Sequence, residues 1–149
     1  MKPVSYENAL ERMGTIIFTV RGISMRPLFR AMTDAILVKK CDPESLKNLD
    51  IVLFKRGKQY VLHRIVDRKS DGRFVIAGDN CCGADIVRPQ DILGIVTSAQ
   101  RGDKPIKLDG VRYDLYEKLW CKPYKFRFVV LSCKFKIRSI ARRILKPGR

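Results

Sequence analysis

Short apolar runs alternate with polar residues through the first hundred positions. Asp, Gly, Asn and Pro punctuate these runs at the spacing that is typical of strands and turns in a mostly β domain. Strands are predicted over residues 15–20, 35–40, 50–55, 60–66, 73–77 and 92–97. Before residue 110 we expect little helix, apart from a short amphipathic helix over residues 5–13 that ends at Gly14.

The hydrophobic pattern changes to helical spacing near the C-terminus. The recurring apolar positions are Phe126, Val130, Cys133, Ile137, Ile140, Ala141 and Ile144. Lys and Arg residues lie mostly on the other side of the same helix. The chain is therefore predicted to consist of a β domain over residues 1–110 and a basic amphipathic segment over residues 111–149.

Charge is concentrated in that second segment. The 149 residues carry a formal net charge of +16, and residues 111–149 contain 12 Lys and Arg against 2 Asp and Glu. A basic amphipathic helix can lie on an anionic membrane surface, with Trp120, Tyr124 and Phe128 suited to the interface. The alternative is that its apolar stripe packs on the β domain. Specific nucleic-acid binding is not expected, because charge alone is no recognition motif.

Cysteine usage and hydropathy bear on location. Five cysteines form an odd set without a Cys-x-x-Cys pair, which favours a reducing cytosol. No N-terminal segment has the character of an export signal, and the longest uncharged apolar run near the C-terminus, residues 128–133, is far shorter than the roughly 20 residues of a membrane span. We expect a cytoplasmic protein, with peripheral contact to the inner face of the membrane through the C-terminal helix as a further option.

A serine follows the first predicted strand in the stretch Gly-Ile-Ser-Met-Arg-Pro-Leu, residues 22–28. Ser24 lies between the strand that ends near Val20 and a helical turn that Pro27 would start well. There a hydroxyl can project from the end of a sheet while backbone N–H groups point at an oxyanion. The alternative is that Ser24 simply caps the helical turn.

His63 is the only histidine in the chain. Strand periodicity places it on the same face as Val61 and Ile65, with Leu62 and Arg64 on the other face. Such a position suits a core histidine, and it also suits the neutral imidazole that usually takes a proton from a serine hydroxyl. No metal site is predicted, because the adjacent pair Cys81 and Cys82 does not have zinc-ligand spacing.

Two aspartates follow His63 in the chain. Asp79 lies in Gly-Asp-Asn, residues 78–80, which on composition alone is an ordinary turn. Asp85 comes six positions later and on the same grounds is an exposed loop carboxylate.

The Ser24 stretch, the Val-Leu-His-Arg-Ile-Val run at 61–66 and the Gly-Asp-Asn turn at 78–80 resemble, in order and spacing, the signal peptidase superfamily of serine peptidases. The resemblance covers roughly residues 15 to 97 and ends with 91–96, which is similar to the family's closing strand. It implies a signal-peptidase/LexA-like coiled β-sheet catalytic domain. The family usually has Gly-Asp at two strand starts where this chain has Thr33 and Leu49, so those turns are expected to differ.

The resemblance implies a nucleophilic role for Ser24. A histidine at position 63 is similar to the Ser-His branch rather than to the Ser-Lys enzymes. In that branch the position of Asp85 completes the charge arrangement by orienting His63 and stabilising the imidazolium. Asp79 is the competing partner for His63, and the sequence does not decide between the two.

Relatives of this kind bind an extended segment by strand addition, so residues 15–20 are the expected edge. Phe18, Val20, Gly22 and Met25 are the expected substrate-binding residues, and a precursor with a signal or leader segment is the expected partner. No cofactor is expected. Gly22 stands where many bacterial members supply an oxyanion-hole hydroxyl, which leaves the Ser24 N–H as donor. The alternative function is a non-catalytic peptide- or membrane-binding homologue. A self-cleaving repressor is not favoured, because residues 1–14 are too short for a helix-turn-helix.

Overall fold

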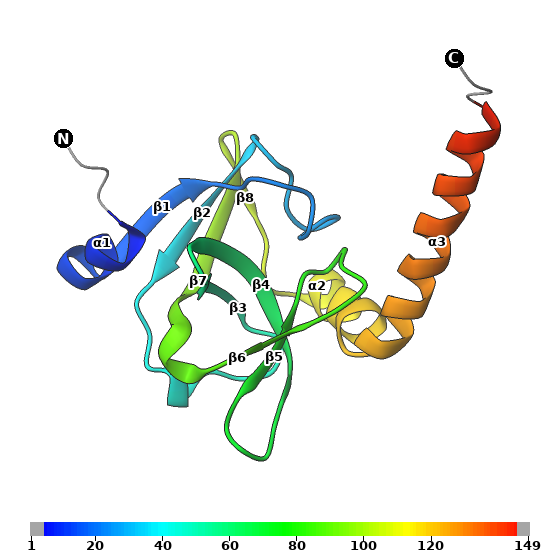
Figure 1. Ribbon diagram of the computed structural model, residues 1–149. Helices are drawn as coiled ribbons and strands as arrows, with labels where there is room; N and C mark the ends of the chain where they lie inside the picture. Colours follow the sequence, from blue (N-terminus) through cyan, green and yellow to red (C-terminus); the bar gives the residue numbers. More distant parts are fainter. Residues whose placement is uncertain (1–4, 146–149) are drawn as a thin grey trace.

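The computed structural model describes residues 5–145 and is mostly β (Figure 1). One curled antiparallel sheet has the strand order β1-β2-β7-β3-β4-β5-β6, with β8 paired to β7. The strands are β1 (Thr15–Thr19), β2 (Asp34–Lys39), β3 (Ile51–Arg56), β4 (Gln59–Arg68), β5 (Phe74–Ala77), β6 (Asp85–Val87), β7 (Ile92–Arg101) and β8 (Lys104–Ile106). The helices are α1 (Tyr6–Met13), α2 (Val111–Tyr116) and α3 (Tyr124–Leu145), with short 3₁₀ turns at Pro43–Ser45 and Pro89–Asp91.

The predicted elements of the β domain are present. Each of the six expected strands has a counterpart, and β6 and β8 are additional three-residue strands too short to show periodicity. The first helix begins where expected, since the Asn8 N–H donates to Ser5 Oγ at 3.2 Å. It ends at Gly14, which has a φ of 70° and donates its N–H to the Leu10 carbonyl. Leu49 has a φ of 81°, so this turn keeps a left-handed conformation that glycine would adopt more readily.

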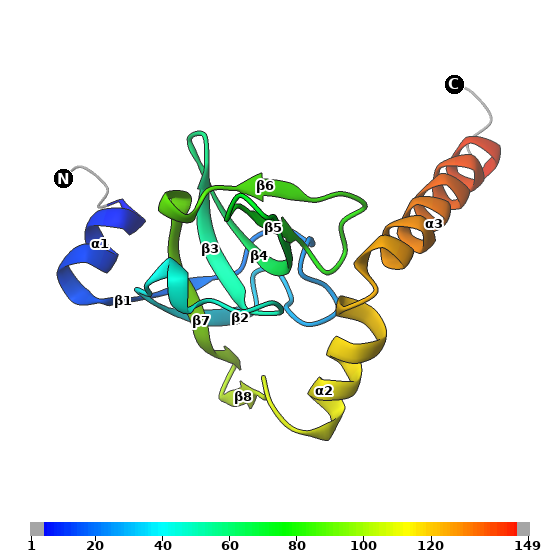
Figure 2. The same cartoon turned by 90° about the horizontal axis from the view of Figure 1, so that it is seen from below.

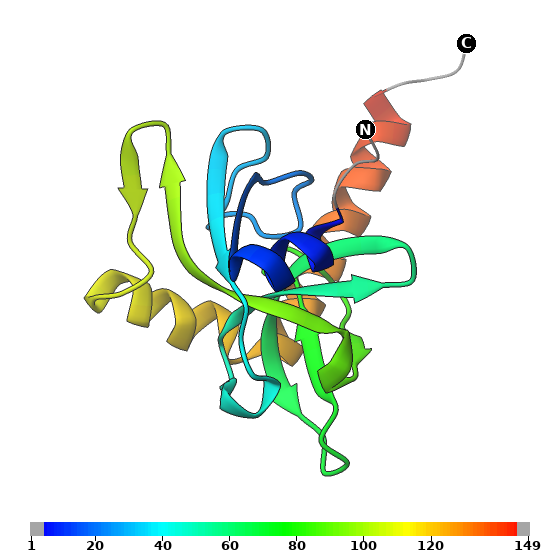
Figure 3. The ribbon, with the colours of Figure 1, turned by 90° about the vertical axis from the view of Figure 1, so that its left-hand side faces the viewer.

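Two hydrophobic clusters form on the sheet. One gathers α1 and the segment after β1, with Leu10, Met25 and Phe29 fully or almost fully buried. The other lies over β3, β4 and β5 and includes Phe54 and Ile65. Viewed from the side, α1 lies in front of the sheet and α3 behind it (Figure 3). In the strand that carries His63, the consecutive residues His63–Val66 are all buried, so both faces of this part of β4 are covered.

The segment between β1 and β2 is fixed at its base. The Val20 N–H donates to the Asp34 carbonyl at 2.9 Å, and the Met32 N–H donates to the Val20 carbonyl at 2.8 Å. The buried Asp34 carboxylate accepts hydrogen bonds from Arg101 and from the Arg30 N–H. Burial alone would raise the pKa of Asp34, but these bonds lower it below its usual value. The segment that contains Ser24 is thus a loop that leaves the sheet and is hydrogen-bonded at its base.

The C-terminal helices α2 and α3 lie at one end of the domain, and α1 lies at the other end (Figure 2). The α2 helix continues into a π-helical turn, Glu117–Cys121, and α3 then projects from the sheet (Figure 1). In α3 only Arg127 and Leu131 are buried. The predicted apolar stripe does not pack on the β domain, because Phe126, Ile137 and Ile140 are exposed on the other side of the helix.

The aromatic residues expected at a membrane interface have partners within the protein. The Trp120 indole N–H donates to the Asp79 carbonyl at 2.9 Å, and the Tyr124 hydroxyl donates to Asp67 Oδ2 at 3.1 Å. Phe128 packs edge-to-face on Tyr124 with ring centroids 5.6 Å apart. The polar ends of Trp120 and Tyr124 are therefore committed to the domain.

Candidate active site

Ser24 is half-buried in a series of turns after β1. The Phe29 N–H donates to the Met25 carbonyl at 3.0 Å, which closes a single helical turn around Pro27, but this turn does not continue into a helix. Within residues 5–145 the Ser24 hydroxyl makes no hydrogen bond, and it does not cap a helix. The hydroxyl is therefore not committed to a structural contact in the described part of the chain.

The Ser24 segment is attached to the Gly-Asp-Asn turn. The Asn80 N–H donates to the Ser24 carbonyl at 2.8 Å, and the Asn80 side-chain amide donates to the Ile23 carbonyl at 3.2 Å. A Cβ on Gly78 would lie 2.6 Å from the Ser24 carbonyl oxygen and 3.0 Å from His63 Nε2. Only glycine permits so close an approach without a shift of the backbone. Three motifs that are far apart in the sequence therefore meet at Gly78.

His63 lies in the middle of β4, paired in register with Val52 of β3. Its side chain is buried, and its ring centroid is 6.1 Å from that of Phe54. Nδ1 is buried without a hydrogen-bond partner in the described residues. Burial lowers the pKa of His63 to about 4, although the negative charge of Asp85 acts in the opposite direction. At neutral pH the imidazole is uncharged and able to accept a proton.

Asp85 is the carboxylate nearest to His63 among the described residues. Its Oδ2 lies 3.9 Å from His63 Nδ1, beyond hydrogen-bonding distance. The same carboxylate binds Arg56, whose Nη1 lies 3.1 Å from Oδ2 and 3.3 Å from Oδ1. Arg56 thus competes with His63 for Asp85, and its positive charge also lowers the pKa of His63.

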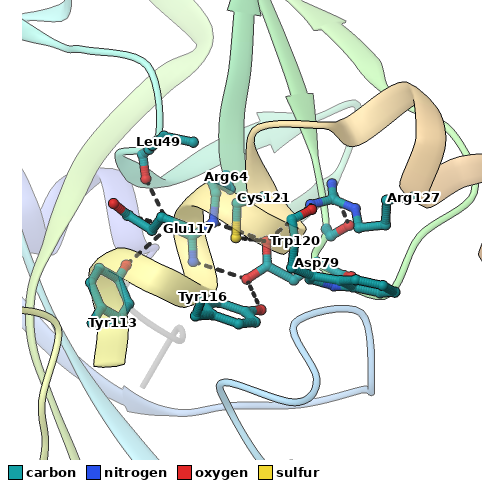
Figure 4. Close-up of polar contacts among 10 residues, drawn as sticks. Leu49, Arg64, Asp79, Tyr113, Tyr116, Glu117, Trp120, Cys121 and Arg127 are labelled. Carbon is teal, nitrogen blue, oxygen red and sulfur yellow. Dashed lines mark hydrogen bonds and ion pairs between the residues drawn. The ribbon is translucent and has the colours of Figure 1, made fainter. Parts of the chain in front are cut away.

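Asp79 has a different set of partners (Figure 4). It is fully buried and forms two parallel bonds with Arg64, each 2.9 Å long. The Tyr116 hydroxyl donates to Asp79 Oδ2 at 2.8 Å. Arg64 also donates to the Leu49 carbonyl, to the Tyr113 hydroxyl and to Glu117. Of the two aspartates left open by the sequence, the structure places Asp85 beside His63 and Asp79 in this ion pair.

The buried network was not foreseen from the sequence. Strand periodicity predicts Arg64 on the face of β4 opposite His63 and indicates no partner for it, yet Arg64 is fully buried. A charged residue among Leu62, Ile65 and Val66 was the available signal, because a buried arginine requires a paired acid. Burial raises the pKa of Tyr116 well above its usual value, and it raises that of Cys121 to about 12. Both groups remain neutral around Asp79.

The same network joins the C-terminal helices to the site. Arg127 of α3 lies beside Trp120 and donates to the carbonyls of Trp120 and Gly78, at 3.2 and 3.4 Å. Trp120 in turn bonds to the Asp79 carbonyl (Figure 4). Trp120 and Arg127 therefore hydrogen-bond to the Gly78–Asn80 turn, which contacts Ser24.

The expected substrate-binding residues have mixed positions. Val20 and Met25 are buried in the hydrophobic core, so their side chains are not available to a substrate. Phe18 is half-buried and stacks on Tyr6 at 5.4 Å between ring centroids. Gly22 is exposed with a φ of 77°. What β1 does offer is a free edge, because within the described chain it pairs only with β2.

Two hollows adjoin the Ser24 segment. One, of about 500 Å³, is lined by Pro27 and Leu28 together with residues of α2, including Tyr113 and Tyr116. The other, of about 580 Å³, has Ile23 on one side and α3 on the other, and its remaining lining residues are Phe135, Arg138, Ser139, Arg142 and Arg143. Ser24 therefore lies in the chain between Ile23, which lines the hollow beside α3, and Pro27, which lines the hollow beside α2.

Metal ligands, thiols and apolar helices are the remaining features of residues 5–145 that bear on the site. This part of the chain contains no group of three or more His, Cys, Asp and Glu side chains that could hold a metal ion. All five cysteines are free thiols. None of its helices combines the length and apolar character needed to cross a bilayer.

No family model matches the chain, and no curated protein matches it.

Proposed function

We propose that the protein is a serine endopeptidase that cleaves an extended signal or leader segment from a precursor peptide. The observation that carries this proposal is the meeting of Ser24 and His63 at Gly78. Both the Ser24 carbonyl and His63 Nε2 lie within 3.0 Å of the point that a Cβ on Gly78 would occupy. The likeness of the three motifs to the signal peptidase superfamily points to the same chemistry.

In the proposed mechanism, His63 Nε2 takes the proton of the Ser24 hydroxyl as the oxygen attacks a peptide carbonyl carbon. The resulting oxyanion would be stabilised by the Ser24 N–H, which makes no hydrogen bond within residues 5–145. The protonated His63 then donates to the leaving amine, so that an acyl-enzyme forms. A water molecule deprotonated by the same imidazole hydrolyses the ester and regenerates Ser24.

Asp85 is the proposed orienting acid for His63. At 3.9 Å it stabilises an imidazolium by charge, and a hydrogen bond would require a closer approach. The low pKa of His63 means that its imidazole is free to accept a proton at neutral pH but is a weak base. Exchange of the Arg56 contact for one to His63 would make the base stronger.

The proposed substrate is an extended chain that adds to the free edge of β1. The exposed Ile17 side chain lies on the solvent side of that strand. The two hollows that adjoin Ile23 and Pro27 would receive side chains of the precursor on either side of the scissile bond.

Cleavage of a library of leader-type peptides tests the proposal. The unmodified protein and its Ser24→Ala variant are incubated with the library, and the products are identified by mass spectrometry. Ser70→Ala, at an exposed turn remote from His63, is the matched control. We expect cleavage by the unmodified and control proteins only. Equal cleavage by the Ser24→Ala variant would exclude Ser24 as the nucleophile.

A non-catalytic peptide-binding homologue is the second candidate function. The observation in its favour is that the Ser24 hydroxyl makes no hydrogen bond to His63 in the described structure. Peptide binding without cleavage by either protein would select this alternative.

A further inference from the structure

The α3 helix has two unlike faces. Toward the domain it buries Leu131 and Arg127, which are 2% and 0% exposed. Large apolar side chains lie on the opposite face, although nothing in the described chain covers them. These are Phe126, Val129, Ile137, Ile140 and Ile144, with exposed fractions of 67%, 61%, 66%, 56% and 71%.

The spacing of these five residues places them along one side of the helix. At 100° per residue they fall within one arc, away from the direction of Leu131. The helix also projects from the sheet, so its outer face has no neighbour among the other described elements (Figures 1 and 2). A stripe of this size on the surface of a protein marks an interaction site.

The charges around the stripe indicate what it binds. Lys125, Lys136 and Arg143 border it, and residues 111–149 as a whole have 12 basic and 2 acidic residues. A second copy of the chain would bring the same positive charges against each other. An anionic bilayer offers both an apolar phase for the stripe and opposite charge for its borders.

We propose that α3 binds the surface of an anionic lipid membrane, with the outer stripe inserted at the boundary between headgroups and acyl chains. The helix lies in the plane of the interface and does not cross it. Because Arg127 and Trp120 join the start of α3 to the Gly78–Asn80 turn, binding also fixes the orientation of the Ser24 segment to the bilayer. The membrane contact does not depend on whether Ser24 is a nucleophile.

Vesicle sedimentation with the full chain tests this surface. One set of vesicles contains equal parts of phosphatidylglycerol and phosphatidylcholine, and the other contains phosphatidylcholine alone. The test variant is Ile137→Gln combined with Ile140→Gln, on the outer face. The matched control is Ser139→Gln, an exposed position that lines the hollow beside Ile23. All three positions are exposed, so an unchanged Tm verifies that each variant folds.

We expect the unmodified chain to bind the anionic vesicles, and the double variant to bind them about tenfold more weakly. Ser139→Gln should bind within about twofold of the unmodified chain. Binding should fall when salt shortens the Debye length to about 3 Å, and it should be weak on phosphatidylcholine alone.

Either of two results would overturn the proposal. One is equal binding of the anionic vesicles by the unmodified chain and the double variant. The other is absence of vesicle binding together with self-association in sedimentation equilibrium that the double variant abolishes. The second result would assign the stripe to a partner copy.

Discussion

The Gly78–Asn80 turn separates two groups of polar side chains that differ in how completely they are bonded. On one side, Asp79 and Arg64 are fully buried and share hydrogen bonds with Tyr113, Tyr116 and Glu117. On the other side, Ser24 makes no side-chain hydrogen bond in the described structure, and His63 Nδ1 is buried without a partner. Buried polar groups are normally satisfied, and Arg127 Nε is the other buried side-chain atom without a hydrogen-bond partner in the described residues. The contrast indicates that the first group stabilises the fold, and it supports the proposal that the second group carries the chemistry.

Breaking the buried Asp79–Arg64 ion pair should have the largest effect on stability. Asp79→Asn removes the carboxylate charge and leaves Arg64 buried beside a neutral amide. We expect the free energy of unfolding to fall by about 3 to 5 kcal/mol. Urea unfolding measures the change.

Asp71→Asn is the control for that variant, because Asp71 pairs with Arg73 at the surface. We expect this control to leave stability almost unchanged, because exposed ion pairs contribute little. If Asp79→Asn behaved like Asp71→Asn, the Asp79 network would not be what fixes the C-terminal helices to the sheet.

The buried His63 imidazole should make the stability of the protein depend on pH. The pKa of His63 is about 4 in the folded chain, against an ordinary value of 6.5 when the chain is unfolded, so the unfolded chain holds the additional proton between these values. Stability from this group is therefore complete above pH 6.5 and declines as the pH falls toward 4, by about 3 kcal/mol in total. His63→Gln should flatten this part of the pH dependence of urea unfolding. An equally steep dependence in the variant would show that other groups cause it.

The junction between the two sides should tolerate only glycine. In Gly78→Ala the new Cβ would lie 2.6 Å from the Ser24 carbonyl and 2.7 Å from Cys81 Sγ, so the backbone must shift. We expect a loss of about 1 to 3 kcal/mol of stability and a larger fractional loss of the proposed peptidase activity. Gly83→Ala, where a Cβ meets nothing within 4 Å, is the matched control. Full peptidase activity in Gly78→Ala would show that the close approach at Gly78 is not needed for the proposed active site.

Substitution of Arg56 should have the smallest effect of these changes, and it should alter only the pKa of His63. Arg56→Gln removes a competitor for Asp85 and a positive charge near His63, so the pKa of His63 should rise. Asp85→Asn should lower it. Because the chain has one histidine, its imidazole signals in an NMR titration report the change without assignment. Equal pKa values in the two variants would remove Asp85 from the proposed mechanism.

The sequence predicted most of the sheet because its strands carry local signals. Apolar runs bounded by Gly, Asp and Pro located six strands, and Ser5 with Gly14 located the ends of α1. The resemblance implies that Ser24, His63 and Asp85 lie in one region, and in the structure the Ser24 carbonyl lies beside Gly78 with His63 Nε2, while Asp85 lies 3.9 Å from His63 Nδ1. The strand and helix predictions needed only short stretches of the chain, whereas the resemblance depended on the order and spacing of three motifs.

Contacts between distant segments could not be predicted in this way. Pairing of Arg64 with Asp79 depends on the register of β4 and β5 and on helices that begin about 30 residues later. Periodicity found the apolar stripe of α3 but not its direction, because which face of a helix is buried is decided by the partner element. Val20 and Met25 are expected from the resemblance to bind substrate, whereas in the structure their side chains fill the core.

Active-site labelling tests the Ser24–His63 pair most directly. The protein is incubated with a fluorophosphonate, and the intact mass and the modified residue are determined by mass spectrometry. We predict one adduct, on Ser24, that forms in the unmodified chain and in Ser70→Ala but is lost in Ser24→Ala and strongly slowed in His63→Gln. Labelling of a different residue, or labelling of Ser24 at the same rate without His63, would contradict the account.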